Sequence, residues 1–276
     1  MILIGEVGGS STEWRVIEDS VIRQFKTIGV NLIHDSVSSF LKKVHKSIAP
    51  YTHADQVFMY FAGLVDVKSR RRSVINEIQK VFPTSKIEIE NDLLAAARGA
   101  LQERSGWVGI LGTGANFAFY NGRLIDQRIA TLGYILGDEG SGAYMGKKLL
   151  TDFGRNRLPA DIENKFRRAY KMDEPTLLAK VYDPTGAKSF LAGFTPFLHQ
   201  HMDHSYCKQL VYQSFLDHFN AMAVNYDLSS SVSYTGSIAF NFSNLLIEAA
   251  KIMRITIGTI TATPIEGLVT FHNTKI

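Results

Sequence analysis

Two glycine-rich segments of the chain have the composition of phosphate-binding turns. The first is Gly8-Gly9-Ser10-Ser11-Thr12, and the second is Gly112-Thr113-Gly114. Glycine lets the backbone approach a ligand closely, consecutive amide N–H groups can form a concave anion site, and Ser and Thr hydroxyls add donors. Either segment alone is more simply a tight turn. Because they occur as a pair, we interpret them as two holders of a polyphosphate.

Asp92 stands where a predicted strand with Ile87 and Ile89 ends and an Ala-rich helix begins, with Asn91 before it as a possible N-cap. A carboxylate in the first turn of a helix stabilises the helix dipole. At the carboxyl end of a strand it also faces the crevice where open α/β sheets bind ligands, and could take a proton from an attacking hydroxyl. The residues alone favour neither interpretation.

The segment Leu136-Gly137-Asp138-Glu139-Gly140-Ser141-Gly142 places two carboxylates within a run of small residues, just before a predicted helix. An ordinary loop does not need this composition, so we interpret the segment as a binding loop. It is not a P-loop, because Gly146-Lys147 is followed by Lys148 rather than by Ser or Thr.

Four potential metal ligands, His199, His201, His204 and Cys207, lie close together in the sequence. At helical spacing no three of them share a face, so we expect no metal site from them.

The strands predicted around the two glycine-rich segments occur as two similar sets in the sequence. Strands are predicted at 2–6, 14–17 and 21–27, and again at 108–111, 117–120 and 124–130. Gly8 and Gly112 differ by 104 positions, and so do Gly29 and Gly133 (133 − 29). Two three-stranded meanders at one separation indicate an internal duplication.

Helices and strands alternate after each meander. The first half continues with a helix at 32–48, a strand at 56–61, a helix at 70–82, a strand at 86–90 and a helix at 93–102. The second continues with helices over about 140–225, a strand at 232–235, a helix at 238–253, a strand at 255–260 and a last helix at 264–272, opened by a capping box from Thr263 to Glu266. This alternation predicts an α/β protein of two similar lobes, with a boundary near 103–106.

Composition limits the alternatives. The chain has 276 residues, 45% of them hydrophobic, a formal charge of +4 and one cysteine, which fits about two domains and excludes a disulfide framework. The N-terminus does not resemble a signal peptide, and no apolar run approaches the ~18 residues of a membrane span, so we expect a cytoplasmic protein. The one dense basic run, at 68–72, is interpreted as a solvated helix face, and we expect no nucleic-acid partner.

The combination of motifs resembles the BadF/BadG/BcrA/BcrD ATPase family, which includes the N-acetylglucosamine kinases, within the actin-like ATPase superfamily. The residues that carry the resemblance are the 136–142 loop, Ile89-Glu90-Asn91-Asp92, Gly112-Thr113-Gly114-Ala115-Asn116, Tyr234-Thr235-Gly236-Ser237-Ile238-Ala239 and Pro264-Ile265-Glu266-Gly267-Leu268. The resemblance implies two ribonuclease H-like lobes, at 1–104 and 105–263, with a nucleotide cleft between them. It also implies that helix 264–276 packs back on the first lobe, and that 140–225 is a helical insertion in the second.

The resemblance further implies a role for each candidate residue. Asp92 is then the general base, and Glu6 helps to hold magnesium. Residues 6–12 and 112–114 bind the phosphates of ATP. Gly236 and Ser237 lie against the adenosine, while Asn31, Asn116 and Asp138 hold sugar hydroxyls.

The implied function is an ATP-dependent kinase that phosphorylates N-acetylglucosamine or a related amino sugar, with ATP and Mg²⁺ as cofactors and a homodimer as one option. An alternative is a non-catalytic nucleotide or sugar sensor, because Ser11 stands where the family usually has Lys or Arg, and Glu6 where many relatives have Asp. Ala115 in place of Ser is a milder departure. An activator of an iron–sulfur enzyme is rejected, since Cys207 gives a dimer only two thiolates for a cluster.

Overall fold

The computed structural model of the protein describes residues 1–19, 21–33, 35–64, 68–128, 131–224, 226–228 and 230–273. The chain divides into two compact units. Unit 1 comprises Met1–Arg104, Gly122–Ile125 and the segment from Thr263 on, and unit 2 comprises Ser105–Asn121 and Asp126–Ala262.

Unit 1 is built on a five-stranded sheet with the order β3-β2-β1-β4-β5. Its strands are β1 (Ile2–Val7), β2 (Ser11–Glu18), β3 (Val21–Ile28), β4 (Gln56–Phe61) and β5 (Lys86–Asn91). β1, β2 and β3 form an antiparallel meander, whereas β4 and β5 run parallel to β1. Val7, Phe61 and Asn91 are in register, so these three parallel strands end at the same edge of the sheet.

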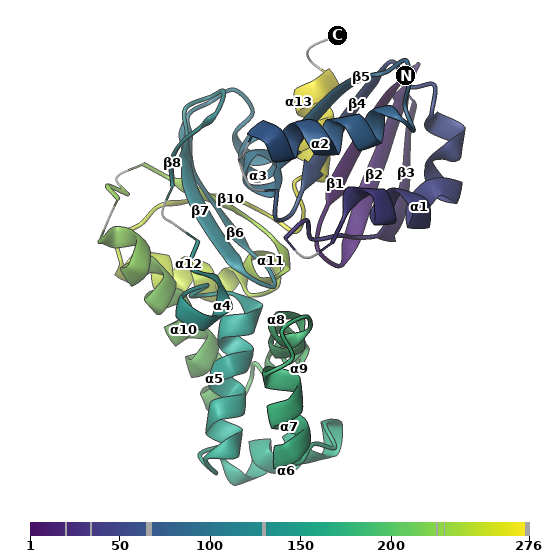
Figure 1. Ribbon diagram of the computed structural model, residues 1–276. Helices are drawn as coiled ribbons and strands as arrows, with labels where there is room; N and C mark the ends of the chain where they lie inside the picture. The colour runs from purple at the N-terminus through teal and green to yellow at the C-terminus, as the bar shows by residue number, and fades with distance from the viewer. Residues whose placement is uncertain are drawn as a thin grey trace. The chain divides into compact units, whose positions relative to one another are not determined.

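Helices cover both faces of this sheet (Figure 1). α1 (Val37–Ile48), followed by a 3-10 turn at Ala49–Tyr51, and α2 (Lys68–Gln79) pack on the face that bears Leu3, Val7 and Trp14. α3 (Asp92–Leu101) and α13 (Ile265–Asn273) pack on the face that bears Ile2 and Ile4. Because side chains alternate along a strand, Glu6 belongs to this second face, called the α3/α13 face below.

Unit 2 repeats this topology with the order β10-β9-β6-β7-β8, which confirms the predicted α/β class in two similar lobes. Its strands are β6 (Gly106–Leu111), β7 (Ala115–Tyr120), β8 (Ile125–Arg128), β9 (Val232–Thr235) and β10 (Ile257–Thr261). β6 and β7 are antiparallel, and β9 and β10 run parallel to β6. Residues 129 and 130 of the strand predicted at 124–130, and residues 274–276, lie outside the described residues.

The duplication is confirmed, but its spacing is not constant. Gly5 lies opposite Trp14 in the β1–β2 register, and Gly109 lies opposite Phe117 in the β6–β7 register. The glycines are 104 residues apart (109 − 5) and the aromatic residues 103 (117 − 14), so the unit 2 hairpin is one residue shorter. The two glycines also differ in their place: Gly29 directly follows β3, whereas Gly133 is the first residue of α4.

Unit 2 is predominantly helical. Its helices are α4 (Gly133–Leu136), α5 (Gly142–Gly154), α6 (Ala160–Ala169), α7 (Glu174–Val181), α8 (Ala187–Ala192), α9 (Thr195–Gln200), α10 (Ser205–Ala223), α11 (Ser237–Asn241) and α12 (Ser243–Ile252). Figure 1 shows α5 to α9 extending away from the sheet of unit 2. Packed aromatic rings fill the core of this part, among them Phe166, which stacks on Phe194 and is tilted against Phe153.

Two predicted helices have different boundaries in the structure. The helix predicted at 32–48 begins at Val37, where Ser36 caps it by accepting from the amide of Ser39 at 3.2 Å. Residues 31–33, 35 and 36 before it form a loop, because the Leu32 amide donates to the Ala62 carbonyl beyond β4. The helix predicted at 238–253 is broken at Phe242 into α11 and α12.

Charged side chains bind α2 and α13 to the sheet of unit 1. Arg71 donates to the Ile89 carbonyl at 3.0 Å and to Glu90 at 2.6 Å, so the interpretation of the basic run as a solvated face is wrong for this residue.

The capping box predicted from Thr263 to Glu266 is only half formed. Thr263 accepts from the Ile265 amide at 3.1 Å, whereas Glu266 binds Arg15 at 2.5 Å.

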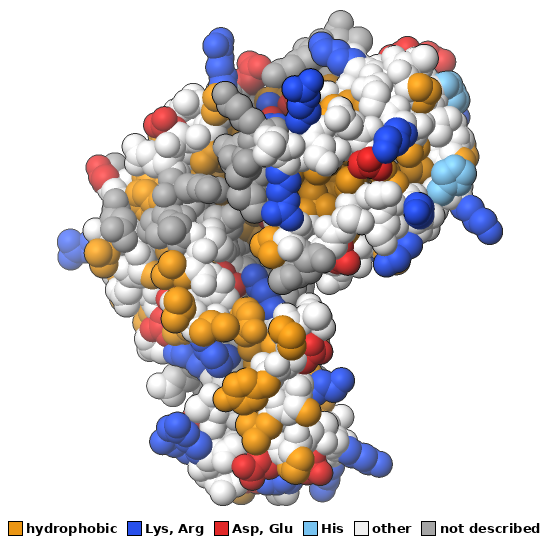
Figure 2. All heavy atoms as spheres, in the orientation of Figure 1, with side chains coloured by type: hydrophobic (Ala, Val, Ile, Leu, Met, Phe, Trp, Pro, Cys, Tyr) orange, Lys and Arg blue, Asp and Glu red, His pale blue; other side chains and the backbone are white. Residues whose placement is uncertain are grey.

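Apolar side chains are exposed on unit 2 at α4. Ile135 and Leu136 are 70% and 72% exposed, and Figure 2 shows apolar side chains gathered around α4 and α5. Within the described ranges, no helix has both the length and the apolar character that crossing a bilayer requires.

Candidate functional site

The first glycine-rich segment is the hairpin between β1 and β2. It is closed by a hydrogen bond of 3.0 Å from the Gly8 amide to the Ser11 carbonyl. The chain after β3 is bound to it, because the Val30 amide donates to Gly8 at 2.9 Å and the Gly29 amide donates to Ser10 at 3.1 Å. The hydroxyl of buried Thr12 donates to the Ile28 carbonyl at 2.8 Å, so in this conformation it anchors the hairpin, while the tip at Gly9-Ser10 is exposed.

Asn31 and Asp92 lie at the same sheet edge as this hairpin. Asn31 follows the hairpin-bound segment, and its Oδ1 accepts from the Ile33 amide at 3.0 Å. Asp92 directly follows β5 as the first residue of α3, and Asn91 caps that helix as predicted, accepting from the Leu94 amide at 2.8 Å. The edge of unit 1 thus combines a hairpin with exposed amides, an amide side chain and a carboxylate.

Glu6 is the half-buried acid beside this edge. Burial raises its pKa from 4.5 to about 7, and the negative charges of Asp92 and Glu13 raise it further, while Lys26 opposes them. A divalent cation bound between Glu6 and a phosphate would relieve this repulsion. Among the described residues no three acids, histidines or cysteines form a metal cage, but Mg²⁺ needs only one or two carboxylates together with substrate phosphates. Glu6 fits that arrangement.

The second glycine-rich segment is the hairpin between β6 and β7. The first amides of α5 donate to its carbonyls, Gly142 to Gly112 at 2.9 Å and Ala143 to Thr113 at 3.1 Å. Gly236, which follows β9, lies against it. Its φ of +117° and the 2.3 Å that would separate an added Cβ from the Leu111 carbonyl leave room only for glycine. The neighbouring Ser237 is exposed at the start of α11.

Asp138 is a buried carboxylate with an unusual backbone conformation, as is typical of a binding residue. It has a left-handed φ of +57°, its side chain is 1% exposed, and the Lys188 ammonium lies 2.8 Å from its Oδ2. Both are beside the hairpin, because a Cβ on Gly114 would be 2.7 Å from Asp138 Oδ2 and 2.2 Å from Lys188 Nζ. Within the described part of the chain, neither carboxylate oxygen has a hydrogen bond of good geometry. Beyond the ion pair with Lys188, the oxygens of this buried carboxylate keep the capacity to accept hydrogen bonds, and hydroxyls of a ligand can supply them.

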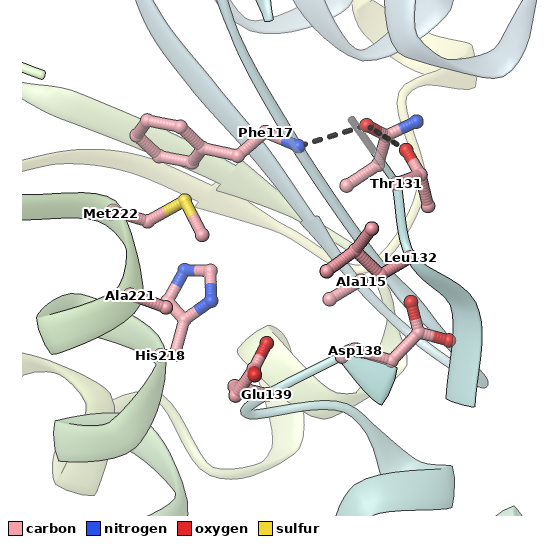
Figure 3. A pocket seen from close by; sticks show the side chains of 11 residues that line it. Ala115, Phe117, Thr131, Leu132, Asp138, Glu139, His218, Ala221 and Met222 are labelled. Atoms are coloured by element: carbon pink, nitrogen blue, oxygen red, sulfur yellow. Dashed lines mark hydrogen bonds between the residues drawn. The ribbon is translucent and has the colours of Figure 1, made fainter. Parts of the chain in front are cut away.

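A pocket of about 200 Å³ opens beside Asp138 (Figure 3). Asn116 and Thr131 form part of its polar wall, and the Thr131 hydroxyl donates to Asn116 Oδ1 at 3.2 Å. Apart from Glu139 and His218, the remaining lining is apolar. It consists of Ala115, Phe117, Leu132, Gly137, Glu139, His218, Ala221 and Met222. The pocket is therefore suited to a small ligand with both hydroxyl groups and an apolar part.

His218 projects into this pocket (Figure 3). Burial lowers its pKa to about 4, so the ring is neutral at pH 7, and its Nε2 lies 3.0 Å from the Tyr234 hydroxyl. Sequence reasoning missed His218 and Lys188. His218 could have been found from its spacing, since Phe215 and Met222 lie three and four residues away on the same buried face of α10.

The four potential metal ligands in and before α10 have other contacts. The His199 ring packs on Phe242, and the His201 ring packs on Phe197. His204 Nδ1 accepts from the Tyr206 amide at 3.1 Å and caps α10, while Cys207 is buried in the core.

The chain resembles solved structures over its full length, and one of them is similar in sequence as well. It is a protein of Porphyromonas gingivalis named "Putative N-acetylglucosamine Kinase", with a TM-score of 0.93 and 30% identity over 100% of both chains. A protein of Chromobacterium violaceum with the same name has a TM-score of 0.70 and 16% identity, with 98% of each chain covered.

More distant structures share the fold alone. A ROK family glucokinase of Streptomyces griseus, solved with glucose and AMPPNP, has a TM-score of 0.58 and 14% identity, covering 99% of this chain and 98% of its own. No protein-family model matches the sequence, and no curated protein matches it either.

Proposed function

Because the chain belongs to the N-acetylglucosamine kinase-like proteins of the actin-like ATPase superfamily, we propose that it is an ATP-dependent sugar kinase. Its acceptor in this proposal is a hydroxyl of N-acetylglucosamine or a related amino sugar. The family membership supports the reaction class, and the geometry of each unit supports the assignment of residues.

The observation that carries the proposal is Asp138, a buried carboxylate paired with Lys188, which lines a pocket together with Asn116 and can accept further hydrogen bonds there. A site built to hydrogen-bond hydroxyls discriminates strongly against ligands that lack them, because its buried groups are then unpaired. In the proposed complex Asp138 and Asn116 hold sugar hydroxyls from unit 2, and Asn31 holds one from unit 1.

The transfer itself requires positioning and charge more than covalent help. In the proposed reaction the sugar oxygen attacks the γ-phosphorus, the bond from that phosphorus to the bridging oxygen breaks, and Asp92 accepts the hydroxyl proton. The hairpins Gly8-Gly9-Ser10-Ser11-Thr12 and Gly112-Thr113-Gly114 bind the phosphates, the first through its exposed tip at Gly9-Ser10, and Gly236-Ser237 contacts the adenosine. Glu6 would help to hold Mg²⁺, which would supply positive charge beside the phosphates.

The proposal is tested by measuring ADP release from the purified chain with ATP, Mg²⁺ and a panel of sugars. The panel contains N-acetylglucosamine, N-acetylmannosamine, glucosamine and glucose. We expect turnover that depends on the sugar and is fastest with an N-acetylated amino sugar. ADP release that is the same with and without every sugar would contradict the proposal.

A further inference from the structure

Three charged side chains form a row across the sheet of unit 1. Glu6 of β1 lies opposite Glu13 of β2, and Glu13 lies opposite Lys26 of β3. Residues directly opposite each other share a face of the sheet, so all three project from the α3/α13 face. The Lys26 ammonium lies 2.9 Å from Glu13 Oε1, and its positive charge also acts on Glu6.

The row lies one step from the phosphate hairpin. On the same face, the next register pair toward the hairpin is Ser11 and Ile28. Diagonal neighbours on antiparallel strands are about 7–8 Å apart, which a lysine side chain can span. The Lys26 side chain is 61% exposed, so it has the freedom to move its ammonium from Glu13 to the hairpin at Ser11.

Other cations on this face are held in place. Arg15 is almost fully buried and lies 2.5 Å from Glu266, and Arg98 is bound to Glu88 at 2.5 Å. Glu6, Glu13 and Asp92 make the surroundings acidic, which is unfavourable for a polyphosphate. Among the described side chains of the row and its neighbours, Lys26 is the cation that is both exposed and close to the hairpin.

We propose that Lys26 is a catalytic residue of the sugar kinase reaction, whose ammonium leaves Glu13 and binds the γ-phosphate oxygens of ATP. The inference rests on the proposed function. Lys26 thereby supplies, from β3, the positive charge that the neutral Ser11 does not provide from the hairpin. It keeps its own proton throughout, since the hydroxyl proton goes to Asp92, and it stabilises the charge that the transferring phosphoryl group spreads over its oxygens.

The ion pair with Glu13 keeps Lys26 in position before ATP binds. When the ammonium leaves, Glu13 retains Arg15, whose guanidinium is 3.6 Å from its Oε2. Glu13 is therefore a positioning residue for Lys26, and moving the lysine does not leave this carboxylate without a cation nearby.

The test compares Lys26→Met with a matched control on the same strand. Arg23 forms an equivalent exposed ion pair, 3.0 Å from Glu18, but it projects from the opposite face of β3. We expect Lys26→Met to lower kcat by about 10- to 100-fold, to weaken AMPPNP binding in calorimetry, and to leave the KM of the sugar within about twofold. Lys26→Arg should retain most of kcat, and Arg23→Met should match the wild type in all three measurements.

A second variant separates the role of charge from the role of folding. In the Lys26→Met background, Ser11→Lys places an ammonium on the hairpin itself and should restore kcat and AMPPNP affinity. A Lys26→Met protein with wild-type kcat and wild-type AMPPNP affinity would overturn the inference while leaving the kinase proposal intact. A wild-type chain without sugar-dependent turnover would overturn the kinase proposal, and AMPPNP binding by Lys26→Met would then still decide whether Lys26 contacts the phosphates.

Discussion

The two units share one sheet topology but differ in what their equivalent faces carry. In unit 1, Glu6 lies opposite Glu13 on the α3/α13 face. In unit 2, the equivalent pair is Ile110 opposite Asn116, because the shorter hairpin shifts the register of β7 by one residue. A glycine beneath an aromatic ring, by contrast, is present in both units, as Gly5 with Trp14 and Gly109 with Phe117.

This difference shows how a duplicated fold can divide the work of one reaction. Both copies retain a glycine-rich hairpin after the first strand, which supports binding of an anion from either unit. In unit 1 the row across β1, β2 and β3 has two acids and the exposed Lys26, which suits proton and phosphoryl transfer. Unit 2 has a neutral amide, Asn116, at the same register, and this residue of β7 lines a pocket together with the buried Asp138, which lies outside the duplicated strands.

The largest expected effect tests the catalytic role of unit 1. Asp92→Asn removes the proposed proton acceptor but keeps the size and helix position of the side chain. We expect kcat to fall by about 10²- to 10⁴-fold with little change in AMPPNP binding. Asp126→Asn, at an exposed position of β8, is the control and should keep wild-type kcat. Equal kcat values for the two variants would remove Asp92 from the mechanism.

The next prediction tests whether Gly29 and Gly133 have different reasons to be glycine. A Cβ on Gly29 would lie 2.0 Å from the Gly8 carbonyl, whereas nothing lies within 4 Å of a Cβ on Gly133, whose φ is +72°. Gly29→Ala should lower the free energy of unfolding by about 2–3 kcal/mol through overpacking, and Gly133→Ala by only about 1 kcal/mol through backbone strain. Urea denaturation measures both, and equal losses would contradict the difference between overpacking at Gly29 and backbone strain at Gly133.

A third prediction concerns substrate binding by unit 2. Asp138→Ala removes a charged acceptor, so we expect the KM of the sugar to rise by about 10- to 100-fold, with the KM of ATP nearly unchanged. Steady-state kinetics with each substrate varied in turn measures this. A change confined to the KM of ATP would instead assign Asp138 to the nucleotide.

The smallest effect concerns Glu6 and pH. Its pKa of about 7 in the folded chain exceeds the ordinary 4.5, so ionised Glu6 destabilises the fold above pH 7, and this cost decreases as the pH falls toward 4.5. Glu6→Gln should therefore raise the free energy of unfolding at pH 8 by about 1 kcal/mol and by much less at pH 5.

Glu6→Gln should at the same time raise the Mg²⁺ concentration that gives half-maximal kcat, because it removes a metal ligand. Gaining stability while losing function is expected for a change at an active site. Urea denaturation at the two pH values, and Mg²⁺ titrations of kcat, measure the two effects. A variant that is less stable than the wild type at pH 8 would show that Glu6 does not have the raised pKa.

Much of the fold follows from local sequence signals. The short strands alternate in hydrophobicity or are wholly apolar, and Asn91 before an Ala-rich helix predicts the start of α3 correctly. The start of α1 could not be predicted in the same way, because the segment from Val30 to Leu32 is bound by long-range backbone hydrogen bonds to the hairpin and to Ala62. Glu266 likewise does not complete the predicted capping box, because its carboxylate binds Arg15, which is 251 residues away in sequence.

The site was only partly accessible from the sequence. Asp138 could be identified because small residues surround it, but its partner Lys188 lies in a short helix with no local pattern that connects the two. The row of Glu6, Glu13 and Lys26 depends on strand register, and a shift of one residue, such as the one in unit 2, would place alternate side chains on the other face. Register is set by the hairpin length, which the repeated glycines did not reveal.

The most direct test of the account is to follow the γ-phosphate itself. The purified chain is incubated with Mg²⁺, N-acetylglucosamine and ATP labelled in the γ-phosphate, beside an Asp92→Asn sample, and the products are separated. The account predicts label in a sugar phosphate with the wild type and almost none with Asp92→Asn. Label that stays in ATP, or that appears only as inorganic phosphate, would contradict it.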